Sequence, residues 1–449
     1  MPVAYASVGW LPALLAIQII MLIFMIKIST DIWRGIGIFA TPRLPCARLL
    51  IGFSAIYAGT MGLRYGLTMI FQPERRWFGG AIPIFFIACS PLSSTHWEGF
   101  ILAKPYLQGL IAHARNLLVL EVGMDFQQLA DKALQGILPE REELKAVLDA
   151  TEEQLPELLS AAFKVRHHYY GKRVQIHVLQ NAKSGLCPED CHYCSQSSVS
   201  EAPIDRYPFM SKEKLIEGAK AAKAAGAVRY CIVNSGRGPT NKEVDEIADA
   251  VRAIRAETGM NVCCSLGLMN QDKTEKLKAA GVGRVNHNLN TSRARHPEIV
   301  TTHTYDDRVA TIESVKHAGI GTCSGGIIGM GESDDDIIDL ALTLRAMDID
   351  SIPVNFLNSI PTTPFENKRE LTPQRCLKTL CLFRFVNPNK EIRVAGGREV
   401  NLRSLQPLSL YPANSMFVNG YLTTPGQEAS DAHRMIADLG FELDSPAPI

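Results

Sequence analysis

Three cysteines near the middle of the chain have the spacing of an iron–sulfur site. Cys187, Cys191 and Cys194 lie within residues 185–196, which read GLCPEDCHYCSQ, and their pattern is C-x3-C-x2-C. Thiolates on one tight loop can bind three corners of a cuboidal cluster, whereas iron–sulfur clusters normally have four cysteine ligands. No fourth cysteine belongs to the loop. The pattern therefore predicts an iron that stays open for a substrate.

Two other interpretations apply to these cysteines. A structural zinc site would use paired C-x2–4-C knuckles with a second pair further along the chain. No second Cys or His pair of that form follows the loop. The three residues would otherwise be unrelated buried cysteines. The compact spacing favours the cluster over both alternatives.

A second group of thiols is spread over separate predicted strands. Cys231, Cys263 and Cys323 each lie in a β-rich segment, at positions that could face a barrel axis, and Arg393 lies in another. A single buried cysteine is usually a small hydrophobic residue. Three at equivalent strand positions, in a chain that already has a cluster loop, indicate a second metal cluster. The remaining cysteines of residues 124–449 are assigned to packing: Cys264, Cys376 and Cys381.

Asparagines near two predicted strand ends can bind polar ligands. Residues 286–290 read NHNLN, and Asn355 lies on a later strand. Amides such as Asn288, Asn290 and Asn355 offer paired donors and acceptors for ribose hydroxyls or a ureido group. Asn also favours turns, so each of them has a structural interpretation as well. Tyr193, inside the cysteine loop, can stack on an adenine or pack locally.

One local unit, repeated along the chain, would position these residues. Residues 223–231, 278–286 and 316–323 each pass from a helix end through a glycine into a short strand. Glycine favours the left-handed conformation that ends helices. Helix starts are marked by a capping box at residues 240–243 and by Asp variants of it at 304–307 and 333–336. Repeated units of this kind imply parallel strands joined by crossover helices.

The number of candidate strands predicts a (β/α)8 TIM-type barrel. A helical lead-in, residues 124–173, precedes it. A doubly wound open sheet is the alternative, but the phosphate-loop pattern is absent and residues 325–332 do not open a dinucleotide fingerprint. The eight candidate strands are residues 174–179, 229–234, 261–265, 284–289, 320–324, 351–357, 391–395 and 415–419.

Composition narrows the class of protein. The chain has 449 residues, with 46 Lys and Arg against 46 Asp and Glu. A net charge of zero gives no basic face for nucleic acid. The 11 cysteines are an odd number and no cleavable secretory signal is recognisable, which argues against a disulfide framework. We therefore expect a reduced, cytoplasmic setting for the catalytic part.

Residues 1–123 differ from the remainder and form an apolar extension. Residues 11–28, 47–63 and 78–92 are apolar runs, two or three of which are candidate transmembrane helices. Lys and Arg follow the first run, so the positive-inside rule places the 29–46 loop in the cytoplasm. Residues 1–92 would then tether the protein to the membrane. The alternative is that residues 1–123 are not translated, since Met124 begins a self-sufficient soluble sequence.

Residues 124–449 closely resemble the biotin synthases, a family of radical S-adenosylmethionine enzymes. The matching motifs cover the whole of this part, whereas the extension lies outside the family pattern. Besides the cysteine loop they are the segments CCSLG at 263–267, NHNLNTS at 286–292, CSGG at 323–326, RVAGGRE at 393–399 and NGYLTT at 419–424.

The resemblance implies a mechanism and a set of ligands. Cys187, Cys191 and Cys194 would hold a 4Fe–4S cluster whose open iron binds S-adenosylmethionine. One electron would cleave this cofactor to a 5′-deoxyadenosyl radical, which abstracts hydrogen from a methyl and a methylene carbon of dethiobiotin. A 2Fe–2S cluster would donate the sulfur, held by Cys231, Cys263, Cys323 and Arg393. An arginine is a poor metal ligand in general, so its role here rests on the resemblance.

The resemblance also implies binding residues and partners. Asn288 and Asn290 would contact the adenosyl ribose or dethiobiotin, and Asn355 would contact dethiobiotin. Many family members carry Asp where this chain has Asn290, so a neutral acceptor replaces a charged one. The implied partners are an electron donor such as flavodoxin or ferredoxin and a second copy of the chain in a homodimer.

Two further functions compete with this one. Another radical S-adenosylmethionine enzyme, such as a lipoyl synthase, would need an additional N-terminal cysteine triplet, which is absent. The other alternative is a membrane-tethered metal-binding protein without turnover. The second constellation, with its three strand cysteines, favours sulfur insertion.

Overall fold

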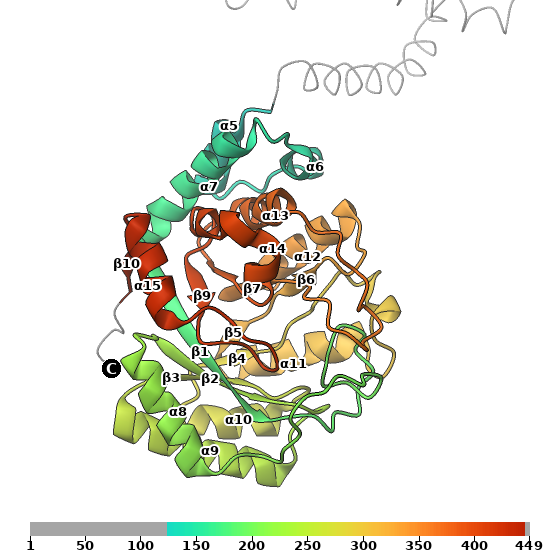
Figure 1. The fold of residues 1–449 in the computed structure, drawn as a ribbon, viewed down its shortest axis with the longest axis vertical. Coiled ribbons are helices and arrows are strands. Elements are labelled where there is room, and N and C mark those ends of the chain that lie inside the picture. Colours follow the sequence, from blue (N-terminus) through green and yellow to red (C-terminus); the bar gives the residue numbers. More distant parts are fainter. Residues whose placement is uncertain (1–123, 445–449) are drawn as a thin grey trace, which may run out of the picture. The chain divides into compact units, whose positions relative to one another are not determined.

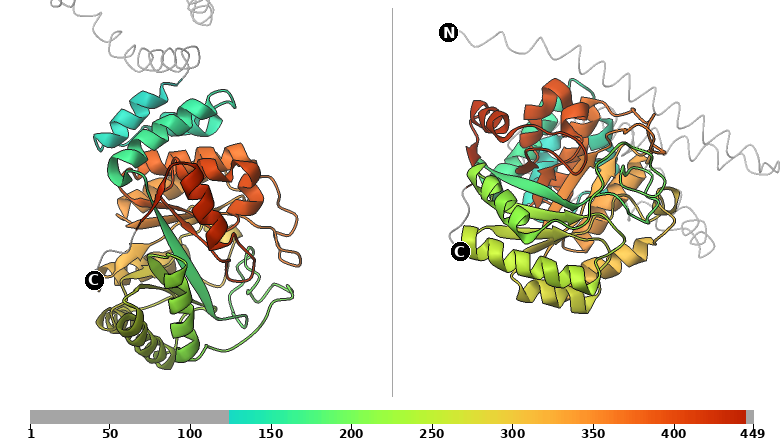
Figure 2. Two further views of the ribbon diagram at one scale, coloured as in Figure 1. Left: turned by 60° about the vertical axis from the view of Figure 1, so that its left-hand side comes forward. Right: turned by 60° about the horizontal axis from the view of Figure 1, so that its bottom comes forward.

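The computed structural model describes residues 124–444, and these contain the predicted barrel. Eight of the strands in this part of the chain run parallel and close into a ring, because β1 pairs with β2 on one side and with β9 on the other. Figures 1 and 2 show the strands inside a layer of helices. The barrel strands are β1 (Arg173–Lys183), β2 (Arg229–Asn234), β3 (Asn261–Ser265), β4 (Arg284–Asn286), β5 (Gly321–Cys323), β7 (Ser351–Phe356), β8 (Glu391–Val394) and β9 (Ser415–Phe417).

The helices begin and end at the sequence signals described above. The three capping boxes form, at Thr240, Thr304 and Ser333. The glycines at 226, 281 and 319 have positive φ angles, as the helix ends require. The helices that follow β1 are α8 (Lys212–Ala224), α9 (Asn241–Thr258), α10 (Gln271–Ala279), α11 (Tyr305–His317), α12 (Asp334–Ala346), α13 (Pro373–Val386), α14 (Arg398–Leu402) and α15 (Ala429–Asp438), with the 3-10 turns η3 (His296–Glu298) and η4 (Arg403–Leu410).

Three helices precede the barrel and lie together beside α13 (Figure 1). They are α5 (Phe126–Leu134), α6 (Arg141–Asp149) and α7 (Leu155–Tyr170). Arg141 of α6 forms an ion pair of 2.6 Å with Asp335 of α12. Within residues 124–444 every helix is too short or too polar to span a membrane. The spans predicted in residues 1–92 lie outside the described residues.

Alternation along the strands separates two kinds of cysteine. Cys263 on β3 faces the barrel interior, whereas the next residue, Cys264, belongs to the hydrophobic core between the sheet and the helices. Cys376 and Cys381 of α13 belong to that core as well. The assignment of these three cysteines to packing is therefore confirmed.

The strands differ from the prediction near their carboxyl ends. The strand predicted at 320–324 is β5, and it is followed by a short strand that was not predicted, β6 (Gly326–Ile328), which pairs with β7. Between the two strands is Gly325, where a Cβ atom would lie 1.9 Å from the carbonyl oxygen of Pro353. Strand β4 ends at Asn286 and not at 289, and Asn290 has a φ of +70°. These irregular ends turn side chains toward the barrel mouth. A last short strand, β10 (Glu442–Leu443), extends the sheet beside the start of β1.

Candidate active site

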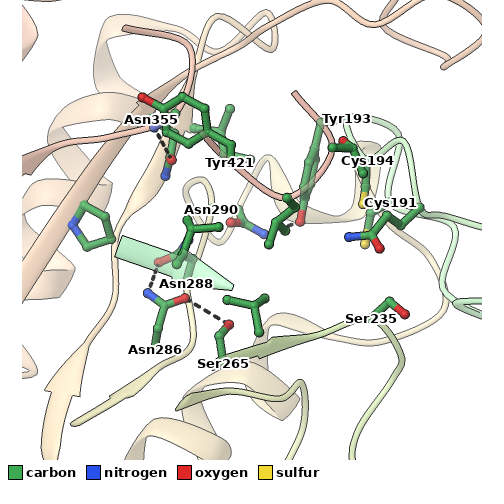
Figure 3. Close-up of a pocket in the computed structure, with 18 of the residues that line it drawn as sticks. Cys191, Tyr193, Cys194, Ser235, Ser265, Asn286, Asn288, Asn290, Asn355 and Tyr421 are labelled. Carbon is green, nitrogen blue, oxygen red and sulfur yellow. Dashed lines mark hydrogen bonds between the residues drawn. The ribbon is translucent and has the colours of Figure 1, made fainter. Parts of the chain in front are cut away.

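A cavity of about 410 Å³ opens at the carboxyl ends of the barrel strands and holds most of the predicted site residues (Figure 3). This end of a parallel barrel is where the loops after each strand converge. The predicted residues that line the cavity are Cys187, Cys191, Tyr193, Cys194, Cys231, Cys263, Asn288, Asn290, Asn355 and Arg393. Cys323 does not line it directly.

The loop that follows β1 brings three thiols to one side of the cavity. Cys187 is partly exposed, and only 8% of Cys191 is exposed. Burial raises the pKa of Cys191 to about 11 and the pKa of Cys194 to about 12. Burial also raises the pKa of Cys187. Because a thiol must lose its proton to bind a metal, these cysteines are neutral until a cationic group replaces the protons.

Three cysteine thiols are the donors that an iron–sulfur cluster uses. Among residues 124–444 no three Cys, His, Asp or Glu side chains gather closely enough to bind one metal ion together. Ligands of a cuboidal cluster bind different irons and therefore stand further apart. The three thiols border one cavity, where each could bind a different iron of a 4Fe–4S cluster.

The second group of cysteines lies deeper in the barrel. Cys231 and Cys263 are directly opposite each other on β2 and β3. The interaction between the two thiols lowers the pKa of Cys231 and, together with burial, raises the pKa of Cys263. Cys323 on β5 accepts a contact of 3.7 Å from Nη1 of Arg393. The structure thus gathers all four predicted residues, and each is at least 96% buried.

A buried ion network holds Arg393 in place. Its Nη2 donates to the Glu391 carboxylate and, at 3.0 Å, to the Ser351 hydroxyl. Burial alone would lower the pKa of Arg393, but Glu391 raises it above its ordinary value. The guanidinium is therefore charged and donates toward the Cys323 sulfur, a state that favours hydrogen bonding over metal ligation. Its Nε has no hydrogen-bond partner, so one buried donor is left for a group bound in this layer.

The asparagines after β4 form a chain of hydrogen bonds (Figure 3). Ser265 Oγ donates to Asn286 Oδ1 at 3.2 Å, and Asn286 Nδ2 donates to Asn288 Oδ1 at 3.0 Å. Asn286 Nδ2 also lies 3.2 Å from the Cys323 sulfur. The Asn288 oxygen accepts a second bond from the Gly325 N–H. The donor side of the Asn288 amide thus remains for a ligand in the cavity.

Asn290 and Asn355 make contacts within the protein that limit their freedom. Asn290 Nδ2 donates to the Tyr193 hydroxyl at 2.5 Å, so it fixes the tyrosine at the edge of the cavity. Asn355 accepts a bond of 2.9 Å from the Gly396 N–H and donates one of 3.0 Å to the Gly326 carbonyl. Both amides line the cavity, and their hydrogen bonds fix neighbouring parts of its wall.

Sequence reasoning missed a buried arginine at the same cavity. Arg308, in the first turn of α11, is 7% exposed. Its Nη1 donates to the Asn288 carbonyl at 2.7 Å, and its Nε has no hydrogen-bond partner. A cation in the first turn opposes the helix dipole. That unfavourable placement is the one sequence signal that distinguishes Arg308 from an ordinary helical arginine.

Two further sets of residues were missed. Glu189, between the loop cysteines, is 5% exposed and binds Thr302, His303 and Arg237. Burial alone would raise the pKa of Glu189, but these hydrogen bonds lower it below its ordinary value. The other set lies in the loop after β9, where the hydroxyl of Thr423 is 2.7 Å from that of Ser195. This second contact joins the C-terminal loop to the cysteine loop across the mouth.

Comparison with known proteins identifies two domains and a group of relatives. Residues 183–344 match the Radical SAM superfamily, and residues 353–442 match the Biotin and Thiamin Synthesis associated domain. The biotin synthase of Bacillus subtilis (strain 168) is 54% identical over 320 residues, which are 71% of this chain and 96% of the relative. The biotin synthase of Halalkalibacterium halodurans is 53% identical over 322 residues, or 72% and 97% of the two chains.

Solved structures of more distant proteins share the barrel. Methylornithine synthase has a TM-score of 0.63 at 22% identity, covering 71% of this chain and 98% of the other. The FeFe-hydrogenase maturase HydG from Carboxydothermus hydrogenoformans has a TM-score of 0.62 at 19% identity, covering 78% and 85%. At these identities the likeness concerns the fold, and it agrees with the predicted TIM-type barrel.

Proposed function

The chain belongs to the biotin synthase family of radical S-adenosylmethionine enzymes, and from that membership we propose how its residues divide the work. It inserts sulfur into dethiobiotin to form biotin. Its cofactors are S-adenosylmethionine, a 4Fe–4S cluster and a 2Fe–2S cluster. One observation carries the residue assignment: a single cavity has loop thiols at its mouth and strand thiols in its depth.

Cys187, Cys191 and Cys194 are the ligands of the 4Fe–4S cluster. When bound, the two clusters and S-adenosylmethionine supply a substrate-oxidising radical and the sulfur atom. The loop would hold three thiolates on one side of the cavity, so that one iron of the cluster would have no protein ligand. The raised thiol pKa values imply that cluster binding releases protons.

Arg308, Asn290 and Tyr193 bind S-adenosylmethionine. The Arg308 guanidinium has a free Nε in a largely buried cavity, and a carboxylate is the partner that a guanidinium binds best. Asn290 fixes the Tyr193 ring beside the second and third cysteines, where the ring can stack on an adenine. The Asn290 oxygen remains as an acceptor for a ribose hydroxyl.

Dethiobiotin lies between the two sets of thiols. The donor side of Asn288 and the amide of Asn355 are suited to the ureido group of the substrate. Leu179, Val233 and Phe417 line the cavity below and would exclude water from the carbons that react. Exclusion of water protects a radical from side reactions.

Cys231, Cys263, Cys323 and Arg393 form the sulfur-donating site. The three thiols supply ligands for the 2Fe–2S cluster, and Arg393 takes the fourth position or donates a hydrogen bond there. The Arg393 contact to Cys323 and its unpaired Nε support this place in the site.

A pair of cysteine variants tests the assignment. Cys231→Ala removes a thiol that faces the cavity, whereas Cys264→Ala removes an equally buried thiol that faces the core. After anaerobic reconstitution we expect Cys264→Ala to form biotin. Cys231→Ala should form 5′-deoxyadenosine with little biotin, because only the sulfur site is damaged. Biotin formation by Cys231→Ala at the wild-type rate would refute the sulfur-donating site.

The overall reaction distinguishes the alternatives. A wild-type protein that forms no 5′-deoxyadenosine from S-adenosylmethionine and reductant would be a metal-binding protein without turnover. If 5′-deoxyadenosine forms and dethiobiotin yields no biotin, the protein is a different radical enzyme.

The proposed function also includes the partners of the protein and its location in the cell. The catalytic domain, residues 124–449, receives electrons from a flavodoxin or ferredoxin, acts in the cytoplasm and forms a homodimer. The apolar runs in residues 1–92 tether it to the membrane. Membrane fractionation with mass spectrometry of the native N-terminus tests the tether, and sedimentation analysis of residues 124–449 tests the dimer.

A further inference from the structure

We propose that Glu189 and Asp190, the two carboxylates between the first and second loop cysteines, are positioning residues that clasp the cysteine loop to the loop after β4. The inference rests on the proposed function, because it takes Cys187, Cys191 and Cys194 as the cluster ligands. The clasp consists of Glu189, Asp190 and their partners at residues 301–303 and 237. Its effect is to set the three thiols before a cluster is bound and to tune the cluster afterwards.

Asp190 forms the outer half of the clasp. Its Oδ1 accepts a hydrogen bond of 2.9 Å from the Thr301 N–H and lies 3.0 Å from the Thr302 hydroxyl oxygen. Its Oδ2 accepts a bond from the Thr301 hydroxyl. In the other direction, the Asp190 N–H donates to the Thr302 hydroxyl at 3.3 Å. One carboxylate therefore binds the backbone and the side chain of a segment more than a hundred residues away.

Glu189 forms the inner half and adds a third loop. Its Oε2 accepts from the Thr302 hydroxyl at 2.7 Å and from His303 Nδ1. Its Oε1 pairs with Arg237 Nη1 at 3.1 Å, and the same nitrogen donates to the Thr302 carbonyl at 2.5 Å. Arg237 belongs to the loop after β2. The buried carboxylate thus joins the loops that follow β1, β2 and β4.

None of these contacts uses a cysteine sulfur, so the clasp can form in the protein without a cluster. Residues 185–200 contain turns and bends but no helix or strand. Fixing such a backbone costs conformational entropy. Hydrogen bonds to the two carboxylates offset part of that cost. The clasp is therefore one of the contacts that hold the cysteine loop in one geometry, beside the Ser195–Thr423 contact.

The clasp also places negative charge beside the cluster. Glu189 is two residues from Cys187 and from Cys191. A nearby negative charge disfavours reduction, which adds an electron. Neutralising Glu189 would leave Arg237 and its charge in place. The midpoint potential of the loop cluster should therefore become more positive.

The test compares Glu189→Gln, Asp190→Asn and Asp190→Ala with a control, Glu201→Gln. Glu201 is an exposed carboxylate on the same stretch of chain, and its N–H, which the substitution keeps, donates to the Thr362 carbonyl. Hydrogen exchange of the cluster-free full chain measures how well residues 185–200 are held in one conformation. Anaerobic titration, with iron and sulfide measured per chain, gives the affinity for the loop cluster. Protein-film or spectroscopic titration reads its potential.

We expect faster exchange in residues 185–200 and roughly 10-fold weaker cluster loading in Asp190→Ala, as for other partners that orient metal ligands. Glu189→Gln keeps the size of the side chain and should retain most loading, with a more positive potential. Glu201→Gln should match the wild type in all three measurements. Such a pattern cannot come from general instability, because Glu189→Gln moves the potential in a loaded protein.

Two results would overturn the clasp. One is wild-type exchange and loading in Asp190→Ala; the other is an unchanged potential in Glu189→Gln. Failure of the proposed function would give a different result, because the wild type would then load a loop cluster and form no biotin. The exchange and loading measurements would still show whether the clasp holds the loop.

Discussion

Replacement of Glu391 by Gln should destabilise the barrel strongly, because this carboxylate is the centre of a buried charge network. The side chain is 7% exposed and pairs with both Arg284 and Arg393. His177 Nε2 lies 3.2 Å from it, and the Ser415 hydroxyl donates to it at 2.8 Å. Burial alone would raise the pKa of Glu391, but the two guanidinium groups hold it well below its ordinary value.

The size of the effect follows from what the substitution leaves behind. Glu391→Gln preserves the shape of the side chain but leaves two buried guanidinium groups without a carboxylate. Removal of one partner of a buried ion pair costs about 3–5 kcal/mol. For a domain of this size each kcal/mol shifts Tm by about 2 °C, so we expect Tm to fall by about 6–10 °C.

The pH dependence of the effect has a definite sign. The pKa of Glu391 is lower in the folded state than in the unfolded state. Its contribution to stability is therefore complete above the unfolded value, about 4.3, and is lost as pH falls through the folded pKa. The difference between wild type and Glu391→Gln should be constant from pH 6 to 8 and should shrink only in stronger acid.

Denaturant and thermal unfolding of the cluster-free chain provide the assay. Glu246→Gln is the control, because Glu246 is an exposed residue whose 3.7 Å ion pair with Lys242 is worth less than about 1 kcal/mol. The double variant Glu391→Gln/Arg284→Met should recover part of the loss, since it removes one unpaired charge. A free energy of unfolding for Glu391→Gln within about 1 kcal/mol of the wild type at pH 7 would show that Glu391 does not stabilise the two buried guanidinium groups.

Three other substitutions have defined outcomes. Burial lowers the pKa of His177 to about 3, so its unfolded form takes up a proton first and wild-type stability should fall by up to about 1.4 kcal/mol per pH unit below pH 6.5; His177→Gln should flatten this slope in unfolding curves. Arg308→Met should weaken binding of S-adenosylmethionine by about 10- to 100-fold, measured by equilibrium dialysis, and near-normal affinity would exclude Arg308 from that site. Asn290→Asp should retain turnover, because the Tyr193 hydroxyl can donate to the new carboxylate, whereas Asn290→Leu should raise KM for the cofactor.

Much of the fold could be predicted because its signals are local. A glycine at the end of a helix, a capping box at its start and a β-branched segment between them each concern a few neighbouring residues. Repeated along the chain, they require parallel strands with crossover helices. The exact strand ends were less predictable. Between β5 and β6, residue 325 lies too close to the Pro353 carbonyl for any side chain, and Pro353 is distant in sequence.

The site residues also differ in how far the sequence alone could predict them. The spacing of Cys187, Cys191 and Cys194 is a property of one loop, so it indicated a cluster directly. The role of Cys231, Cys263 and Cys323 needed a strand map, since only alternation distinguishes a cysteine that faces the interior from one that faces the core. That distinction was correct for Cys263 and Cys264.

The tertiary structure alone decided which distant polar residues meet. Glu189 binds His303, 114 residues away, and Arg308 reaches the Asn288 carbonyl. Neither pairing has a local signal, because barrel closure brings together loops that follow different strands. The cysteine spacing by itself thus predicted a cluster loop. The closed barrel determined what holds that loop and what faces it, since buried polar groups find their partners only where the packed chain places them.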